Sequence, residues 1–256
     1  MIPKIELIPN RRGHYYNVEG YPHEFPSVTT ILSATLPKPA LAQWGIRVAI
    51  DYIRNRLLAN PFDLENWPSW DEFVEWVCDK AALRPQEIAT EAAGFGTRVH
   101  AACEAYAKGQ EWDGVLAAFG ADVEPSLQGF RQWIQDNDIR IDRSEQKLYS
   151  PTLIVAGSAD IIGRRGTRRI VADIKTSKGI WPEFAYQVGG GYALMWDEVL
   201  GDEFGCIEEA WIIRLPKTAG EKLPFEAKRV KSLIRAKEGF KLLRRLFDIQ
   251  KEKHFV

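Results

Sequence analysis

The stretch GSADIIGRRGTRRIVADIKTSKG, residues 157–179, places charged side chains inside otherwise apolar segments. Two runs rich in Ile, Val and Ala flank the tetrapeptide RRGT, and this pattern predicts a β-hairpin that turns near Gly166. Because side chains alternate along a strand, Asp173 and Lys175 share one face, and the turn sets Asp160 roughly across from Asp173. Charges are costly to bury unless they are paired or bind a metal. The stretch is therefore either a solvated hairpin face or a site.

A metal site is one chemical reason for this combination of residues. Two neighbouring carboxylates repel each other, and they remain ionised together most easily with a hard cation between them. Mg²⁺ takes one or two carboxylates and keeps waters that a phosphate can replace. A lysine beside them can orient the attacking water or offset charge that develops on the phosphate. Taken alone, however, Asp-x-Lys on a strand is more often an exposed ion pair of little consequence.

The patterns around this hairpin predict helices followed by a small sheet. Strand-length apolar or alternating segments lie at 139–150, 153–163, 168–176 and 207–216, and two short strands are expected within 14–28. A Ser- or Thr-capped helix follows and is broken near Pro37 and Pro39. Further helices are expected at 69–83, 84–110, 124–138, 182–200 and 227–253. This order predicts an α/β (α+β) domain with an N-terminal helical layer. We expect strands and the helical layer at 1–90 and the core at 91–256, in one continuous globular unit.

Composition and charge narrow the functional classes. The net charge of the 256 residues is −1, but residues 1–137 hold 12 Lys and Arg against 18 Asp and Glu, whereas residues 138–256 hold 22 against 17. This asymmetry is compatible with an anionic ligand bound by the C-terminal half. We expect no membrane segment and no secretion signal, because no apolar run approaches the roughly 20 residues of a membrane helix. The three widely spaced cysteines argue against a disulfide framework, so a reducing, cytoplasmic setting is expected.

Other motifs accompany the hairpin in a defined order. The segment GTRVHAACE places His100 and Glu104 on one helix face, four residues apart. After the hairpin come Gln187 and Tyr192. The succession G-T-x-x-H-x-x-x-E, G-S-x-D, D-I-K-T and Q with a following Y, together with PSVTTIL upstream, resembles the RecB-like branch of the PD-(D/E)xK nuclease superfamily. It is most similar to phage-type exonucleases and the mitochondrial genome maintenance exonuclease, over roughly Pro26 to Tyr192.

The resemblance implies a restriction-endonuclease-like core, with a central mixed β-sheet flanked by helices. It also implies a metal site for Mg²⁺ or Mn²⁺, held by His100, Asp160, Asp173 and the backbone carbonyl of Ile174. Glu104 would assist as an outer group or as a ligand of a second metal. An iron–sulfur cluster, which some relatives carry, needs four cysteines and is not expected, because the sequence has three.

The resemblance assigns catalysis to Lys175 and a positioning role, toward DNA or the lysine, to Gln187 and Tyr192. The family separates that Gln and Tyr by three residues, whereas four residues separate them in this sequence. Either the intervening glycines form a bulge in the helix that restores the facing, or Tyr192 has lost the role.

The implied activity is metal-dependent hydrolysis of DNA from single-stranded or free ends. It would serve phage or bacterial replication, recombination or repair, and a protein of replication or recombination is a possible partner. Basic side chains that would grip the phosphate backbone are Arg164, Arg165, Arg168, Arg169, Lys178, Lys231, Arg235, Lys241, Arg244 and Arg245. Exposed aromatics such as Trp181 would stack on bases. For the C-terminal helix, solubilising charges explain the pattern equally well. The alternatives are a non-catalytic DNA-binding module on the same fold and a structure-selective or restriction-type endonuclease.

Overall fold

The computed structural model describes residues 3–9, 13–59, 69–218 and 224–252. The chain divides into two compact units, one made of residues 1–36 and 98–256 and the other of residues 37–97. This division differs from the predicted boundary at residue 90, because the N-terminal strands belong with the core. We describe each unit by itself.

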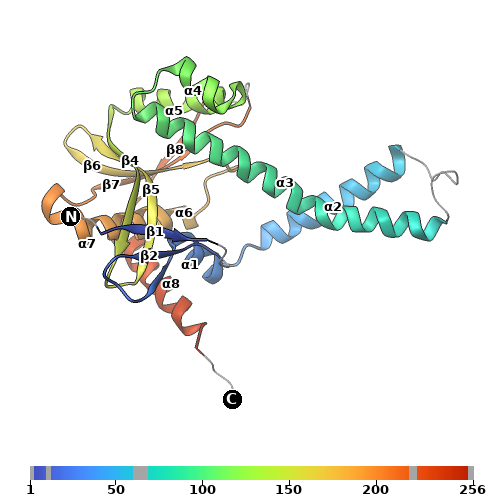
Figure 1. Cartoon of the computed structure of the whole chain (residues 1–256), viewed down its shortest axis with the longest axis horizontal. Coiled ribbons are helices and arrows are strands. Elements are labelled where there is room, and N and C mark those ends of the chain that lie inside the picture. The colour runs from blue at the N-terminus through green and yellow to red at the C-terminus, as the bar shows by residue number, and fades with distance from the viewer. Residues whose placement is uncertain (1–2, 10–12, 60–68, 219–223, 253–256) are drawn as a thin grey trace. The chain divides into compact units, whose positions relative to one another are not determined.

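A mixed sheet forms the centre of the larger unit, as expected, but it has five strands where four were predicted (Figure 1). The additional strand, Glu226–Arg229, lies where the helix predicted at 227–253 was expected to begin. Its strands lie in the order β4 (Ile139–Ser150), β5 (Val155–Arg165), β6 (Arg168–Lys175), β7 (Glu209–Arg214) and β8 (Glu226–Arg229). The β6–β7 pair is parallel and the other pairs are antiparallel. In the predicted hairpin, Arg165 pairs with Arg168 around Gly166, whose φ of +57° is easy for a residue without a Cβ. Strands β4, β5 and β6 are joined as an antiparallel meander, whereas β7 is parallel to β6 and must be reached by a crossover connection.

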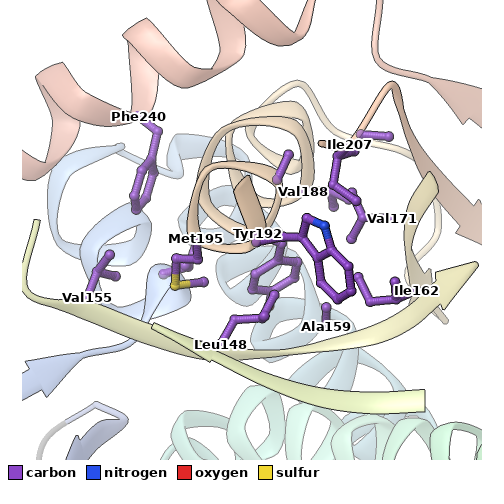
Figure 2. Close-up of a cluster of buried hydrophobic side chains, with 14 of the residues drawn as sticks. Leu148, Val155, Ala159, Ile162, Val171, Val188, Tyr192, Met195, Ile207 and Phe240 are labelled. Carbon is purple, nitrogen blue, oxygen red and sulfur yellow. The ribbon is translucent and has the colours of Figure 1, made fainter. Parts of the chain in front are cut away.

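The crossover from β6 to β7 is helical. It consists of α6 (Glu183–Ala185), the π-helix η2 (Tyr186–Tyr192) and α7 (Ala193–Phe204). Its buried side chains pack on the sheet, and Figure 2 shows Tyr192 and Met195 above Leu148 and Ala159 of the strands. Helix α8 (Leu233–Ile249) packs against η2 and adds Phe240 to this core. The approach is close enough that a Cβ on Gly190 would lie 2.6 Å from a backbone oxygen of α8.

The N-terminal strands join the same unit through a second apolar cluster. The strands β1 (Ile5–Ile8), β2 (Tyr15–Val18) and β3 (Glu24–Pro26) form an antiparallel sheet. Phe25 is fully buried and packs with Ala156 of β5, and Ser27 forms an isolated bridge to the same alanine. Ser27 also caps α1 (Val28–Thr35), because its hydroxyl accepts a hydrogen bond from the amide of Thr30 at 2.9 Å. These contacts explain why the strands belong with the core.

The remaining helices include α4 (Trp112–Phe119), the 3-10 turn η1 (Ala121–Val123) and α5 (Glu124–Asp136). The smaller unit contains α2 (Pro39–Ala59) and the first part of α3 (Trp70–Ala107), whose last turns lie in the larger unit. The two helices expected at 69–83 and 84–110 are one helix, which continues through Pro85. Among the described residues, no helix combines the length and apolarity needed to cross a membrane.

Candidate functional site

The hairpin strands part where their two acidic residues meet. The β5–β6 ladder ends at the pair Ile161 and Ala172, so the next position of the register sets Asp160 opposite Asp173. There the carboxylate of Asp160 accepts a hydrogen bond from the amide of Ile174 at 2.6 Å. The side chain of Asp160 thus bonds the backbone amide of the residue that follows Asp173 in β6. The predicted juxtaposition of the two carboxylates is confirmed.

Asp173 is the centre of a buried network. It is 2% exposed, and its Oδ2 lies 2.5 Å from the ammonium nitrogen of Lys175. Its Oδ1 accepts a hydrogen bond from the side-chain amide of Gln187 at 3.0 Å, and the same amide donates to the hydroxyl of Tyr192 at 2.9 Å. Oδ1 of Asp173 is therefore hydrogen-bonded, whereas its buried Oδ2 has no hydrogen-bond partner among the described residues and has the Lys175 ammonium beside it as an ion pair.

The π-helix explains how Gln187 and Tyr192 meet despite the additional residue between them. Hydrogen bonds in a π-helix join residues five apart, whereas those of an α-helix join residues four apart. Residues 187 and 192 are five apart, so η2 brings their side chains to one face. Of the two alternatives left open by the sequence, the structure contains the helical bulge, which places the side chains of Gln187 and Tyr192 on the same side of the helix.

His100 reaches the same place from α3. Its Nδ1 lies 3.3 Å from Oδ2 of Asp160. Burial lowers the pKa of His100, but the carboxylates of Asp160 and Asp173 outweigh this effect and raise it to about 9. For the carboxyl group of Asp173, burial has the opposite effect and raises the pKa to about 6. Lys175 opposes this increase, and the charge of Asp160 adds to it. For Asp160, burial is outweighed by His100, Lys175 and the Ile174 amide, so its pKa is lowered.

A small cavity of about 10 Å³ adjoins His100 and Asp160, with room for one water molecule or ion. A third acidic residue, Glu145 of β4, also lines it. Ligand atoms of His100, Glu145 and Asp160 all lie within 4.8 Å of one another. Burial raises the pKa of Glu145, and the nearby charge of Asp160 adds to the increase. Glu145 was not expected from the sequence, because it stands among polar residues of a strand and belongs to no recognisable motif.

The donor set around this cavity suits a hard divalent cation. Imidazole nitrogen and carboxylate oxygen are ligands that Mg²⁺ and Mn²⁺ accept. Two ligand atoms that each lie about 2.1 Å from one ion are at most about 4.2 Å apart. The three ligand atoms lie within 4.8 Å of one another, so the side chains would have to move only slightly closer to bind one ion. Glu104 lines the cavity as well, but its carboxylate is paired with Lys108. Neither Glu104 nor Asp173 belongs to the three-residue group found among the described residues.

The arginines of the hairpin turn are paired with acidic side chains. Arg164 and Arg169 contact Asp142, with nitrogen–oxygen distances of 2.9 and 3.4 Å. Arg165 and Arg168 contact Glu209 at 3.6 and 2.9 Å. A phosphate would have to compete with these carboxylates. Five other predicted contact residues are exposed: Lys178, Lys231, Arg235, Lys241 and Arg245.

Arg244 is a correction to the predicted DNA-binding set. It is 8% exposed, and its guanidinium donates to the backbone carbonyls of Leu153, at 2.7 Å, and Ile154, at 3.5 Å. It also pairs with Asp248 on its own helix. The amphipathic pattern of the C-terminal helix turns this residue inward, where it ties α8 to the loop before β5. Trp181, in contrast, is 49% exposed, as a base-stacking role requires.

Comparisons with known proteins give little. No family model matches the sequence, and no curated protein matches it. One solved structure with some similarity is the crystal structure of SSO0001, which is 13% identical. The match covers 54% of this chain and 63% of that chain, with a TM-score of 0.28. This chain thus matches less than two thirds of that protein's length, and a likeness this weak shows no family.

Proposed function

We propose that this protein is a nuclease that hydrolyses DNA phosphodiester bonds with the help of a divalent metal, acting on free single-stranded ends. One observation carries the proposal. Side chains from separate segments of the chain meet in two adjacent groups. His100 pairs with Asp160, and Asp173 pairs with Lys175 and accepts a hydrogen bond from Gln187. The groups adjoin because the carboxylate of Asp160 accepts a hydrogen bond from the amide of Ile174, the residue after Asp173. Each of these residues was expected at such a site because of the resemblance to RecB-like nucleases.

The topology is consistent with the PD-(D/E)xK core that we propose for the larger unit. An antiparallel meander β4-β5-β6 leads through a helical crossover to β7, which lies parallel to β6. The site lies where β5 and β6 part, on one side of this crossover.

The proposed metal would be held by His100, Asp160, Asp173 and the carbonyl of Ile174, as the resemblance implies. Mg²⁺ or Mn²⁺ there would lower the pKa of a bound water and offset negative charge on the phosphate. His100 must be neutral to bind a metal. Its proton, held by the neighbouring carboxylates, has to leave first.

The chain's own groups divide the remaining work. Lys175, held 2.5 Å from Asp173, would orient the attacking water and offset the charge that develops on the phosphate. Gln187 fixes the other oxygen of Asp173, so the carboxylate cannot rotate freely. Tyr192 occupies the second hydrogen of that amide. Gln187 and Tyr192 are therefore positioning residues in this proposal.

The substrate would approach along the loop that follows Lys175. Lys178 and Trp181 are both exposed there and offer a cation for phosphate and a ring for an unpaired base. Contacts of this kind do not depend on sequence and weaken with salt. We therefore expect little sequence preference, and the resemblance implies a role in replication, recombination or repair.

The proposal is tested with end-labelled linear single-stranded DNA and a circular single-stranded control, in Mg²⁺ or Mn²⁺. The wild type should degrade the linear strand alone, and Lys175→Ala should lower the rate by about a hundredfold or more. The matched control is Lys228→Ala, an exposed lysine of β8 paired with Glu226, which should keep the wild-type rate.

Three outcomes would count against the proposal as stated. Cutting of the circle would make the protein an endonuclease. DNA binding without cleavage in either metal would favour the non-catalytic binding module. Equal loss of activity in both lysine variants would remove Lys175 from its proposed role.

A further inference from the structure

Three acidic residues lie in a row across adjacent strands. The pairs Ser144–Ile161 and Gln146–Ala159 flank Glu145 and set it opposite Asp160 in the β4–β5 register. The β5–β6 register sets Asp160 opposite Asp173. The row therefore runs from β4 through β5 to β6, and only Asp160 and Asp173 of its three members were expected from the sequence.

Glu145 leaves the regular strand geometry at this point. Its φ is +47°, in the left-handed region that residues with a side chain seldom adopt, and the ladder skips it. Its carboxylate accepts a hydrogen bond from the hydroxyl of Ser158 at 2.8 Å. The side chain lines the cavity beside His100 and Asp160. A conformation of this cost persists where the surrounding structure holds it, often at functional sites.

When Glu145 and Asp160 are both ionised, the charges of the row do not balance without a further cation. Asp173 is paired with Lys175, so these two charges offset each other. Glu145 and Asp160 remain, and like charges directly opposite on neighbouring strands are destabilising. The imidazole of His100 supplies at most one positive charge. A divalent cation at the cavity would balance both carboxylates and leave the imidazole free to bind as a neutral ligand.

We propose that Glu145 is a ligand of the divalent cation, together with His100 and Asp160, an inference that rests on the proposed function. The three donors lie within 4.8 Å of one another around a cavity with room for one ion. Asp173, the further ligand that the resemblance implies, lies next to Asp160 in the row and is paired with Lys175. The site thus uses a carboxylate from β4 in addition to those of the hairpin.

The test is Mn²⁺ binding, measured by the electron paramagnetic resonance signal of free Mn²⁺, and the rise in melting temperature that Mn²⁺ produces. Glu145→Gln keeps the size of the side chain and removes its charge. It should weaken Mn²⁺ binding at least tenfold and shrink the Mn²⁺-induced rise, with a metal-free melting temperature no lower than that of the wild type. Glu226→Gln is the matched control, since Glu226 is a half-buried strand carboxylate paired with Arg214, and should bind as the wild type does.

The outcomes separate this inference from the proposed function. If the wild type binds no Mn²⁺, both fail. If His100→Gln and Asp160→Asn lose binding while Glu145→Gln stays within twofold of the wild type, only the role of Glu145 is overturned. Should Glu145→Gln not fold, Glu145→Asn serves instead, because Asn tolerates a positive φ better than Gln.

Discussion

The protonation of His100 gives the sharpest quantitative prediction. In the metal-free protein its pKa is raised to about 9 by Asp160 and Asp173, so at pH 7 nearly every molecule carries the imidazolium. A metal binds only the neutral imidazole. Metal affinity should therefore rise with pH and level off above about 9.

The size of the expected change in metal affinity follows from the two pH units between pH 7 and the pKa of about 9. Each unit below the pKa lowers the neutral fraction about tenfold, so the affinity at pH 7 should be about a hundredfold below its plateau. Binding at pH 7 should also release about one proton per cation. His100→Gln should bind more weakly, with little pH dependence between 7 and 9.

The assay is Mn²⁺ titration at pH 7, 8 and 9, with calorimetry at pH 7 in two buffers of different ionisation enthalpy. The difference between the buffers counts the released protons. A wild-type affinity that is constant from pH 7 to 9, with no proton release, would refute the argument. It would mean that the cation does not displace the proton of His100.

Three further predictions concern stability. Without metal, the pKa of His100 is above its unfolded value, so its stabilising contribution is complete below pH 6.5 and is lost as the pH rises through 9. The free energy of unfolding should fall over that range by up to about 3 kcal/mol, and His100→Gln should remove the decline in urea melts. Gly190→Ala should lower the free energy of unfolding by about 1–3 kcal/mol, because its Cβ would lie 2.6 Å from a backbone oxygen of α8. Gly94→Ala should raise it by up to about 1 kcal/mol, because a Cβ there has nothing within 4 Å among the described residues. Equal melting temperatures for the two variants would contradict this. Arg244→Ala should cost about 1–3 kcal/mol, because it leaves the backbone carbonyls of the half-buried Leu153 and Ile154 without their donor. The exposed Arg245→Ala should cost under about 0.5 kcal/mol. The folded Arg244 variant should keep the wild-type DNA affinity in binding titrations.

Much of the fold could be read from local patterns in the sequence. The hairpin with its turn near Gly166, the strand at 139–150 and the α5 helix are confirmed, because the spacing of apolar residues is a local property of the chain. The meeting of Asp160 and Asp173 also follows from the hairpin, since the turn fixes the register. The predicted break between residues 83 and 84 was wrong, because α3 continues through Pro85.

Other features depend on contacts between distant segments, and the sequence does not determine them by itself. The φ of Glu145 and its place beside His100 follow from the packing of β4, β5 and α3. The π-helix that aligns Gln187 with Tyr192 was one of two open alternatives. The pattern of α8 shows its amphipathic character, but only the folded chain shows that Arg244 points inward to bond the loop before β5. Local periodicity sets which elements form, whereas burial and the pairing of charges across the fold decide which side chains meet.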